Sequence, residues 1–104
     1  MRLRLMPDYD CHPLWLVLPD GVKNLDPATL PISTDLRQTL KDWAASYDKT
    51  LNEGDPANSG FPSEAEESQF ESTGIRLWDL LRSELGPGFE VTYFSQKAHR
   101  ELGR

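Results

Sequence analysis

Residues 63–93 read SEAEESQFESTGIRLWDLLRSELGPGFEVTY, and this stretch decides the fold because a helix, a helix stop and a strand follow one another in it. Ser63 and Glu66 match a capping box, in which the two side chains satisfy backbone N–H groups at the start of a helix. Gly86 suits the left-handed position after a last helical turn, and Pro87 strengthens the stop. An apolar stripe lies between these signals, at Phe70, Gly74, Leu77, Leu81 and Leu85. The pattern predicts an amphipathic helix.

Three short segments have the patterns of β-strands. Arg2–Leu5 and Phe89–Tyr93 alternate between polar and apolar residues, which is typical of strands with one buried face. Leu14–Leu18 is apolar at every position, which indicates a strand covered on both faces. We expect the first and the last of these three segments in the chain to join the sheet. The middle one either forms a hairpin with Arg2–Leu5 or is an extended stretch that packs across the core.

A second amphipathic helix is predicted over residues 34–50. Ser33 is a good N-cap, and Asp35 would lie in the first turn, where the helix dipole favours negative charge. Apolar residues then follow at spacings of three or four, at Leu36, Leu40, Trp43, Tyr47 and Leu51. The neighbouring stretches 22–32 and 52–62 contain several prolines or glycines, so we expect both to be irregular.

These elements predict one α+β domain of two layers, with the order β-β-α-α-β. Two helices with one apolar face each need a surface to bury against, and a small sheet provides it. We therefore expect a mainly antiparallel sheet of two or three strands, packed on an antiparallel helix pair. Residues 1–95 would form this single globular domain. Residues 96–104 lack periodicity and are expected to be a loosely ordered tail.

The sequence also resembles a pattern in small uncharacterised bacterial proteins. The matching residues are mostly core and turn positions: Leu30-Pro31, Leu36, Leu40, Trp43-Ala44, Tyr47-Asp48, Thr50-Leu51, Asp55-Pro56, Ser59-Gly60-Phe61 and Glu84-Leu85-Gly86. The resemblance implies a bacterial source and a shared fold, and it brings no activity with it.

The amino-acid composition limits the classes of protein to which this chain can belong. The chain has 104 residues, of which 38% are apolar, and a net charge of −6, so it is typical of an acidic globular domain. It lacks the many Lys and Arg side chains that sequence-independent binding to nucleic acid needs. Its longest apolar run, Leu14–Leu18, is too short to span a bilayer. With one cysteine, Cys11, the chain fits a reducing compartment, and we expect a cytoplasmic protein without nucleic-acid or membrane partners.

The negative charge is concentrated in one segment. Residues 42–71 hold eight carboxylates against one base, Lys49, which gives a local charge of −7. If the helices are antiparallel, the end of the first and the start of the second meet, and the carboxylates gather at one end of the molecule. A surface of one sign steers partners of the opposite sign. The alternative is that this surface only interacts with water and with the helix dipole.

We interpret the chain as a small non-enzymatic protein-binding module, similar to an immunity protein or an antitoxin. Its acidic end would engage a basic protein, for example a toxin, and the chain itself would be a monomer or a weak homodimer. Large aromatic side chains anchor many interfaces. The candidate partner-binding residues are five carboxylates and two aromatic anchors: Asp48, Glu53, Asp55, Glu64, Glu67, Phe61 and Trp78.

Two other functions stay open. One is a structural or housekeeping protein that self-associates through an exposed strand edge and Trp15. The other is a small metal- or thiol-dependent enzyme centred on the turn with Asp8, Asp10, Cys11 and His12, whose side chains are of the ligand types. Adjacent cysteine and histidine side chains tend to point apart, so we assign no catalytic, cofactor or metal residue. We expect the aspartates of this turn to accept local backbone hydrogen bonds.

Overall fold

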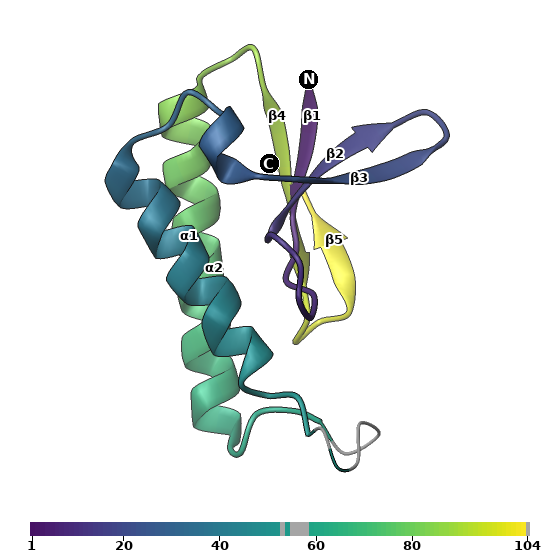
Figure 1. Ribbon diagram of the computed structural model, residues 1–104, viewed down its shortest axis with the longest axis vertical. Coiled ribbons are helices and arrows are strands. Elements are labelled where there is room, and N and C mark those ends of the chain that lie inside the picture. Colours follow the sequence, from purple (N-terminus) through teal and green to yellow (C-terminus); the bar gives the residue numbers. More distant parts are fainter. Residues whose placement is uncertain (53, 55–58, 104) are drawn as a thin grey trace.

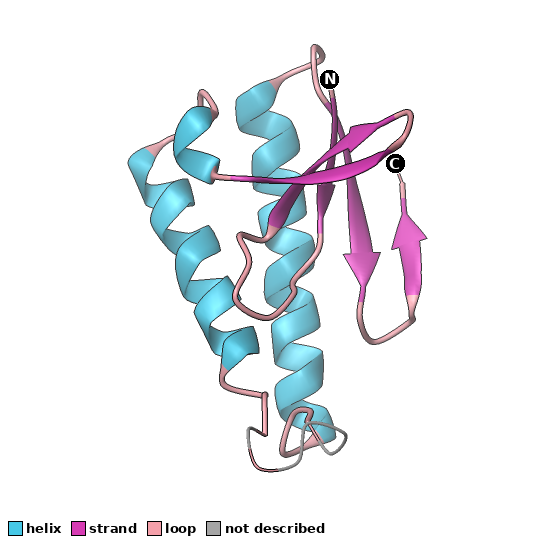
Figure 2. Ribbon diagram, turned by 45° about the vertical axis from the view of Figure 1, so that its right-hand side comes forward, coloured by secondary structure: helices cyan, strands magenta, loops and turns pink. Residues whose placement is uncertain are grey.

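The computed structural model describes residues 1–52, 54 and 59–103, and it has two layers. Helices α1 (Thr34–Asp48) and α2 (Glu64–Leu85) run antiparallel to each other on one side of a five-stranded sheet (Figures 1 and 2). The predicted α+β class and both predicted helices are confirmed. Among the described residues, neither helix has the length and apolarity that crossing a membrane requires.

The sheet has the strand order β3-β2-β1-β4-β5. Its strands are β1 (Arg2–Leu5), β2 (Leu14–Leu18), β3 (Gly21–Leu25), β4 (Glu90–Ser95) and β5 (Arg100–Leu102). β1 pairs with β2 in an antiparallel hairpin, which settles the open alternative for Leu14–Leu18. β1 and β4 are parallel neighbours, because the crossover through both helices returns the chain in the same direction.

The sheet differs from the prediction in two respects. It has five strands instead of two or three, and it is mixed because β1 and β4 are parallel. β3 lies partly in stretch 22–32, which we expected to be irregular, and all its residues are exposed or half-buried. β5 lies in stretch 96–104, where the sequence showed no periodicity. Edge strands such as these are held by pairing with one neighbour, so they lack the burial pattern that identifies a strand in a sequence.

The helices begin where the sequence indicated. The Ser33 side chain accepts a hydrogen bond from the backbone N–H of Leu36, and the Ser63 side chain accepts one from that of Glu66. Gly86 ends α2 with a φ of 76°, in the range that favours glycine. These caps confirm the predicted helix boundaries to within two residues.

The core lies between the helix layer and the sheet. Alternate residues of β1 and β4 point toward the helices, while Arg2 and Arg4 lie on the outer face. The buried core residues include Leu3, Leu5, Leu14, Leu36, Leu40, Trp43, Leu77, Leu81, Val91 and Tyr93. The helices are therefore fixed to the sheet along one side, and the opposite side of the pair remains available to other molecules.

Candidate partner-binding site

A hollow with a volume of about 570 Å³ lies between α1 and α2, and we call it the aromatic groove. Its aromatic lining consists of Trp43, Phe61 and Phe70. The rings of Trp43 and Phe70 are stacked with centroids 4.5 Å apart, and the Phe61 ring lies 5.0 Å from Phe70. Trp43 and Phe70 are almost completely buried, whereas Phe61 is half-buried. Phe61 is thus the aromatic side chain of the groove that a partner can reach.

Hydrogen bonds hold this aromatic cluster in place. The Trp43 indole N–H donates to the backbone carbonyl of Phe70 at 3.1 Å, which ties α1 to α2 below the groove. The backbone N–H of Gly60 donates to the carbonyl of Thr50 at 2.9 Å, next to Phe61. This bond ties the backbone beside Phe61 to the segment that follows α1.

The rim of the aromatic groove is polar and carries more negative than positive charge. Asp42 on α1 and Glu66 on α2 line it from opposite helices, and Lys49 is the one base among the described lining residues. The Asp42 carboxylate accepts a hydrogen bond from the Gln38 amide at 2.9 Å. Glu64 lies in the same first turn of α2 as Glu66, where the helix dipole stabilises a carboxylate.

A protein-family model described as Serratia CdiI immunity protein-like matches residues 1–96. The chain belongs to the Serratia CdiI immunity protein-like family. Membership of this immunity-protein family confirms the predicted immunity-like, protein-binding function, and it implies a toxin protein as the partner. It also points to a role without enzymatic activity. A comparison with curated proteins gave no match.

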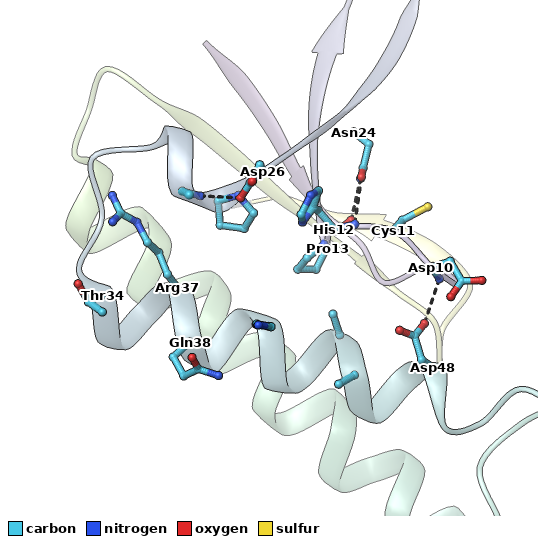
Figure 3. A pocket seen from close by; sticks show the side chains of 15 residues that line it. Asp10, Cys11, His12, Pro13, Asn24, Asp26, Thr34, Arg37, Gln38 and Asp48 are labelled. Atoms are coloured by element: carbon cyan, nitrogen blue, oxygen red, sulfur yellow. Dashed lines mark hydrogen bonds between the residues drawn. The ribbon is translucent and has the colours of Figure 1, made fainter.

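The structure brings some of the predicted partner-binding residues of this CdiI-like protein together. Phe61 lines the aromatic groove, and Glu64 and Glu67 lie in the adjacent first turn of α2. Asp48 instead lies on the other side of α1, where its carboxylate accepts a hydrogen bond from the backbone N–H of Asp10 at 3.1 Å (Figure 3). The remaining two carboxylates, Glu53 and Asp55, fall outside the described residues.

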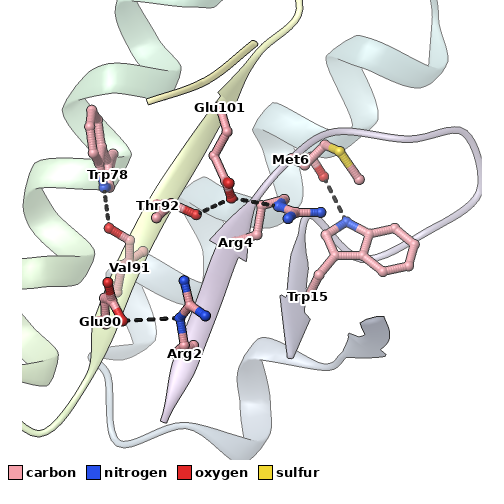
Figure 4. Close-up of polar contacts among 9 residues, drawn as sticks. All are labelled: Arg2, Arg4, Met6, Trp15, Trp78, Glu90, Val91, Thr92 and Glu101. Atoms are coloured by element: carbon pink, nitrogen blue, oxygen red, sulfur yellow. Dashed lines mark hydrogen bonds and ion pairs between the residues drawn. The ribbon is translucent and has the colours of Figure 1, made fainter. Parts of the chain in front are cut away.

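Trp78 is buried and does not belong to the surface of this CdiI-like protein. Only 2% of the residue is exposed, and its indole N–H donates to the backbone carbonyl of Val91 at 2.8 Å (Figure 4). The sequence placed Trp78 beside the apolar stripe, but the residue follows Phe70 by eight and Gly74 by four positions. It therefore lies on the buried face, and we do not place it in the partner-binding surface.

Sequence reasoning passed over two residues of the groove rim, Asp42 and Glu66. Both lie in the acidic segment, but Asp42 had no distinguishing pattern and Glu66 was assigned only to the capping box with Ser63. Glu66 precedes Phe70 by four residues, which puts both side chains on neighbouring positions of one helical face. This spacing is the signal that could have identified Glu66.

The turn at residues 8–12 packs on the end of α1. Asp8 accepts a hydrogen bond from the backbone N–H of Tyr9 at 2.8 Å, as predicted for this turn. The Tyr9 ring stacks on Tyr47 with centroids 4.7 Å apart, and burial together with Tyr9 raises the pKa of Tyr47 to about 12. The turn thus has a structural role in joining the sheet to α1.

The same turn does not have the electrostatics of a reactive thiol site. Burial, followed by the nearby carboxylates of Asp8, Asp10 and Asp48, raises the pKa of the Cys11 thiol. Reactive cysteines have a lowered pKa, because the thiolate is the nucleophile. In the part of the chain that the structure describes, no three His, Cys, Asp or Glu side chains are grouped so that they could hold a metal ion.

Proposed function

We propose that this CdiI-like immunity protein neutralises a basic toxin by binding it over the aromatic groove. The observation that carries the proposal is the half-buried Phe61 ring in a groove that the carboxyl side chains of Asp42 and Glu66 also line. Binding hot spots typically combine a well-packed aromatic anchor with a polar rim that excludes water. The groove has both parts: Phe61 in the loop before α2 is the anchor, and Asp42 and Glu66 on the two helices belong to the rim.

The acidic rim and the aromatic cluster affect toxin binding in different ways. The carboxylates at the rim and in the first turn of α2 attract a basic surface and raise the association rate. The aromatic cluster supplies contact area after encounter. Because the Trp43 indole is already hydrogen-bonded to Phe70, the cluster loses little conformational freedom when the partner binds.

A toxin that acts on nucleic acid fits this groove best. Proteins that bind nucleic acid present Lys and Arg side chains to the phosphates, so their active surfaces are basic. An immunity protein with an acidic rim can cover such a surface and exclude the substrate. We infer that the partner is a toxin of this class.

The test is a pull-down from a lysate of the source organism at low salt, with four baits. The wild type and Asp20→Lys, a reversal in the remote β2–β3 turn, should retain the same basic protein and release it when salt is raised. Phe61→Ala and Glu66→Lys should retain much less of it. Equal capture by all four baits, or capture of an acidic protein, would overturn the proposal.

A further inference from the structure

We propose that a second hollow, on the other side of α1, binds a carboxylate side chain of the toxin. We call this hollow, with a volume of about 760 Å³, the polar cleft; α1, the turn at residues 10–13 and the 3-10 helix η1 (Pro27–Thr29) line it (Figure 3). The inference rests on the proposed function and adds a second contact of opposite sign to it.

Two cations of α1 line the polar cleft, and no carboxylate of the described residues pairs with either. Arg37 and Lys41 are four residues apart, so they occupy neighbouring positions on the helix, where like charges repel. Among the described residues, neither forms an ion pair. The charge of both side chains is therefore available to an anion.

Arg37 has unused hydrogen-bonding capacity. Its Nη2 donates to the backbone carbonyl of Leu30 at 2.8 Å, and its Nε is buried without an acceptor in the described part of the protein. The planar guanidinium group matches a carboxylate in particular, because two parallel N–H groups can bind its two oxygens.

Two of the three carboxylates that also line the polar cleft accept hydrogen bonds from backbone N–H groups. Asp26 accepts a hydrogen bond from the backbone N–H of Ala28 at 2.9 Å and so caps η1. Asp48 accepts one from the backbone N–H of Asp10, and Figure 3 shows both residues at the end of the cleft opposite Arg37. Arg37 and the pair Asp10 and Asp48 thus lie at opposite ends of the cleft, with Asp26 between them.

This arrangement of charges favours a protein segment with an acidic residue as the occupant. An Asp or Glu of the toxin would bind at Arg37 and Lys41, while basic residues of the toxin face the rim of the aromatic groove across α1. Contacts of opposite sign on the two sides of one helix fix the orientation of the partner. They also reject partners whose charges are uniformly basic.

The test is a titration of the isolated protein followed by ¹H–¹⁵N NMR, including the Nε–H signal of Arg37. N-acetylglutamate N-methylamide should cause saturable shifts at Arg37 and Lys41, whereas the corresponding lysine compound should not. Lys41→Gln, a substitution at an exposed position, should weaken the binding of the glutamate compound by about tenfold. Arg76→Gln removes the same charge at an exposed position of α2, outside the lining of both hollows, and should leave the titration unchanged.

Three outcomes would overturn the inference. They are the absence of a saturable shift, shifts in Lys41→Gln equal to those in the wild type, and tighter binding of inorganic phosphate than of the glutamate compound. The last would identify a phosphate site. No toxin is present in this experiment, so its failure leaves the proposed function intact, and failure of the pull-down does not affect the titration.

Discussion

Gly74 allows α2 to lie close to the side chains of Tyr93 and Trp43. A Cβ atom at this position would lie 2.5 Å from the Tyr93 hydroxyl oxygen and 2.7 Å from Cζ2 of Trp43. Neither neighbour can easily move, because the Tyr93 hydroxyl donates to Glu71 and the Trp43 indole donates to Phe70. Glycine is therefore required here by space within the helix.

We predict that Gly74→Ala lowers the free energy of unfolding by about 1–3 kcal/mol, the usual cost of overpacking a core. The steric cost of the added methyl group should exceed the gain in helix stability of about 1 kcal/mol that alanine has over glycine. Urea denaturation measures the difference. Gly88→Ala is the control, since a Cβ there meets no atom within 4 Å. A Gly74→Ala variant as stable as the wild type would show that α2 can shift away from the sheet.

At the scale of elements, β5 is joined to the sheet by a side-chain network on the outer face (Figure 4). The Glu101 carboxylate accepts hydrogen bonds from Thr92 on β4 at 2.6 Å and from Arg4 on β1 at 2.8 Å. The bond from Thr92 and then the bond from Arg4 lower the pKa of Glu101 below its ordinary value of 4.5. One side chain thus connects three strands.

We predict that Glu101→Gln reduces stability in a pH-dependent way. Because the pKa is lower in the folded state, the ionised carboxylate stabilises the fold fully above the ordinary pKa of 4.5, and this contribution disappears as the pH falls through the folded-state pKa. The difference in unfolding free energy from the wild type should be about 0.2–1 kcal/mol at neutral pH, since the carboxylate is partly exposed, and should shrink toward zero in acid. A difference that persists at low pH would contradict this explanation. Glu90→Gln, which removes a more exposed pair with Arg2, should have a smaller effect.

The sequence patterns predicted the helices and strands that have one face buried in the core. α1, α2, β1 and β4 have periodic apolar residues, because each contributes one side to the core. β3 and β5 have no such pattern: β3 is exposed or half-buried along its length, and β5 has only three residues. Their strand conformation follows from pairing with β2 and β4, which a local sequence pattern does not contain.

At the scale of the whole molecule, the sequence located the acidic segment but not its division between two surfaces. Asp42 and Asp48 are six residues apart on α1, so they lie on different sides of the helix. Asp42 lines the aromatic groove and Asp48 lines the polar cleft. This division depends on where α2 and the turn at residues 10–13 pack against α1, which is a tertiary property.

The proposed steering by the acidic end gives the last prediction. Reversing Glu64, Glu66 and Glu67 to lysine should slow association with the captured toxin by about tenfold or more at low salt and flatten the salt dependence of the rate. Stopped-flow measurements over a range of ionic strengths test this. The matched control reverses three exposed carboxylates outside the acidic segment, Asp20, Asp79 and Glu90.

The comparison separates local steering from net charge, because both triple variants change the total charge equally. If the position of the charges matters, only the first variant should lose the salt-dependent part of its association rate, while the control should keep most of it. Equal slowing in both variants would mean that net charge alone governs encounter. Because the three glutamates also stabilise the start of α2, circular dichroism should verify that both variants are folded at the temperature of measurement.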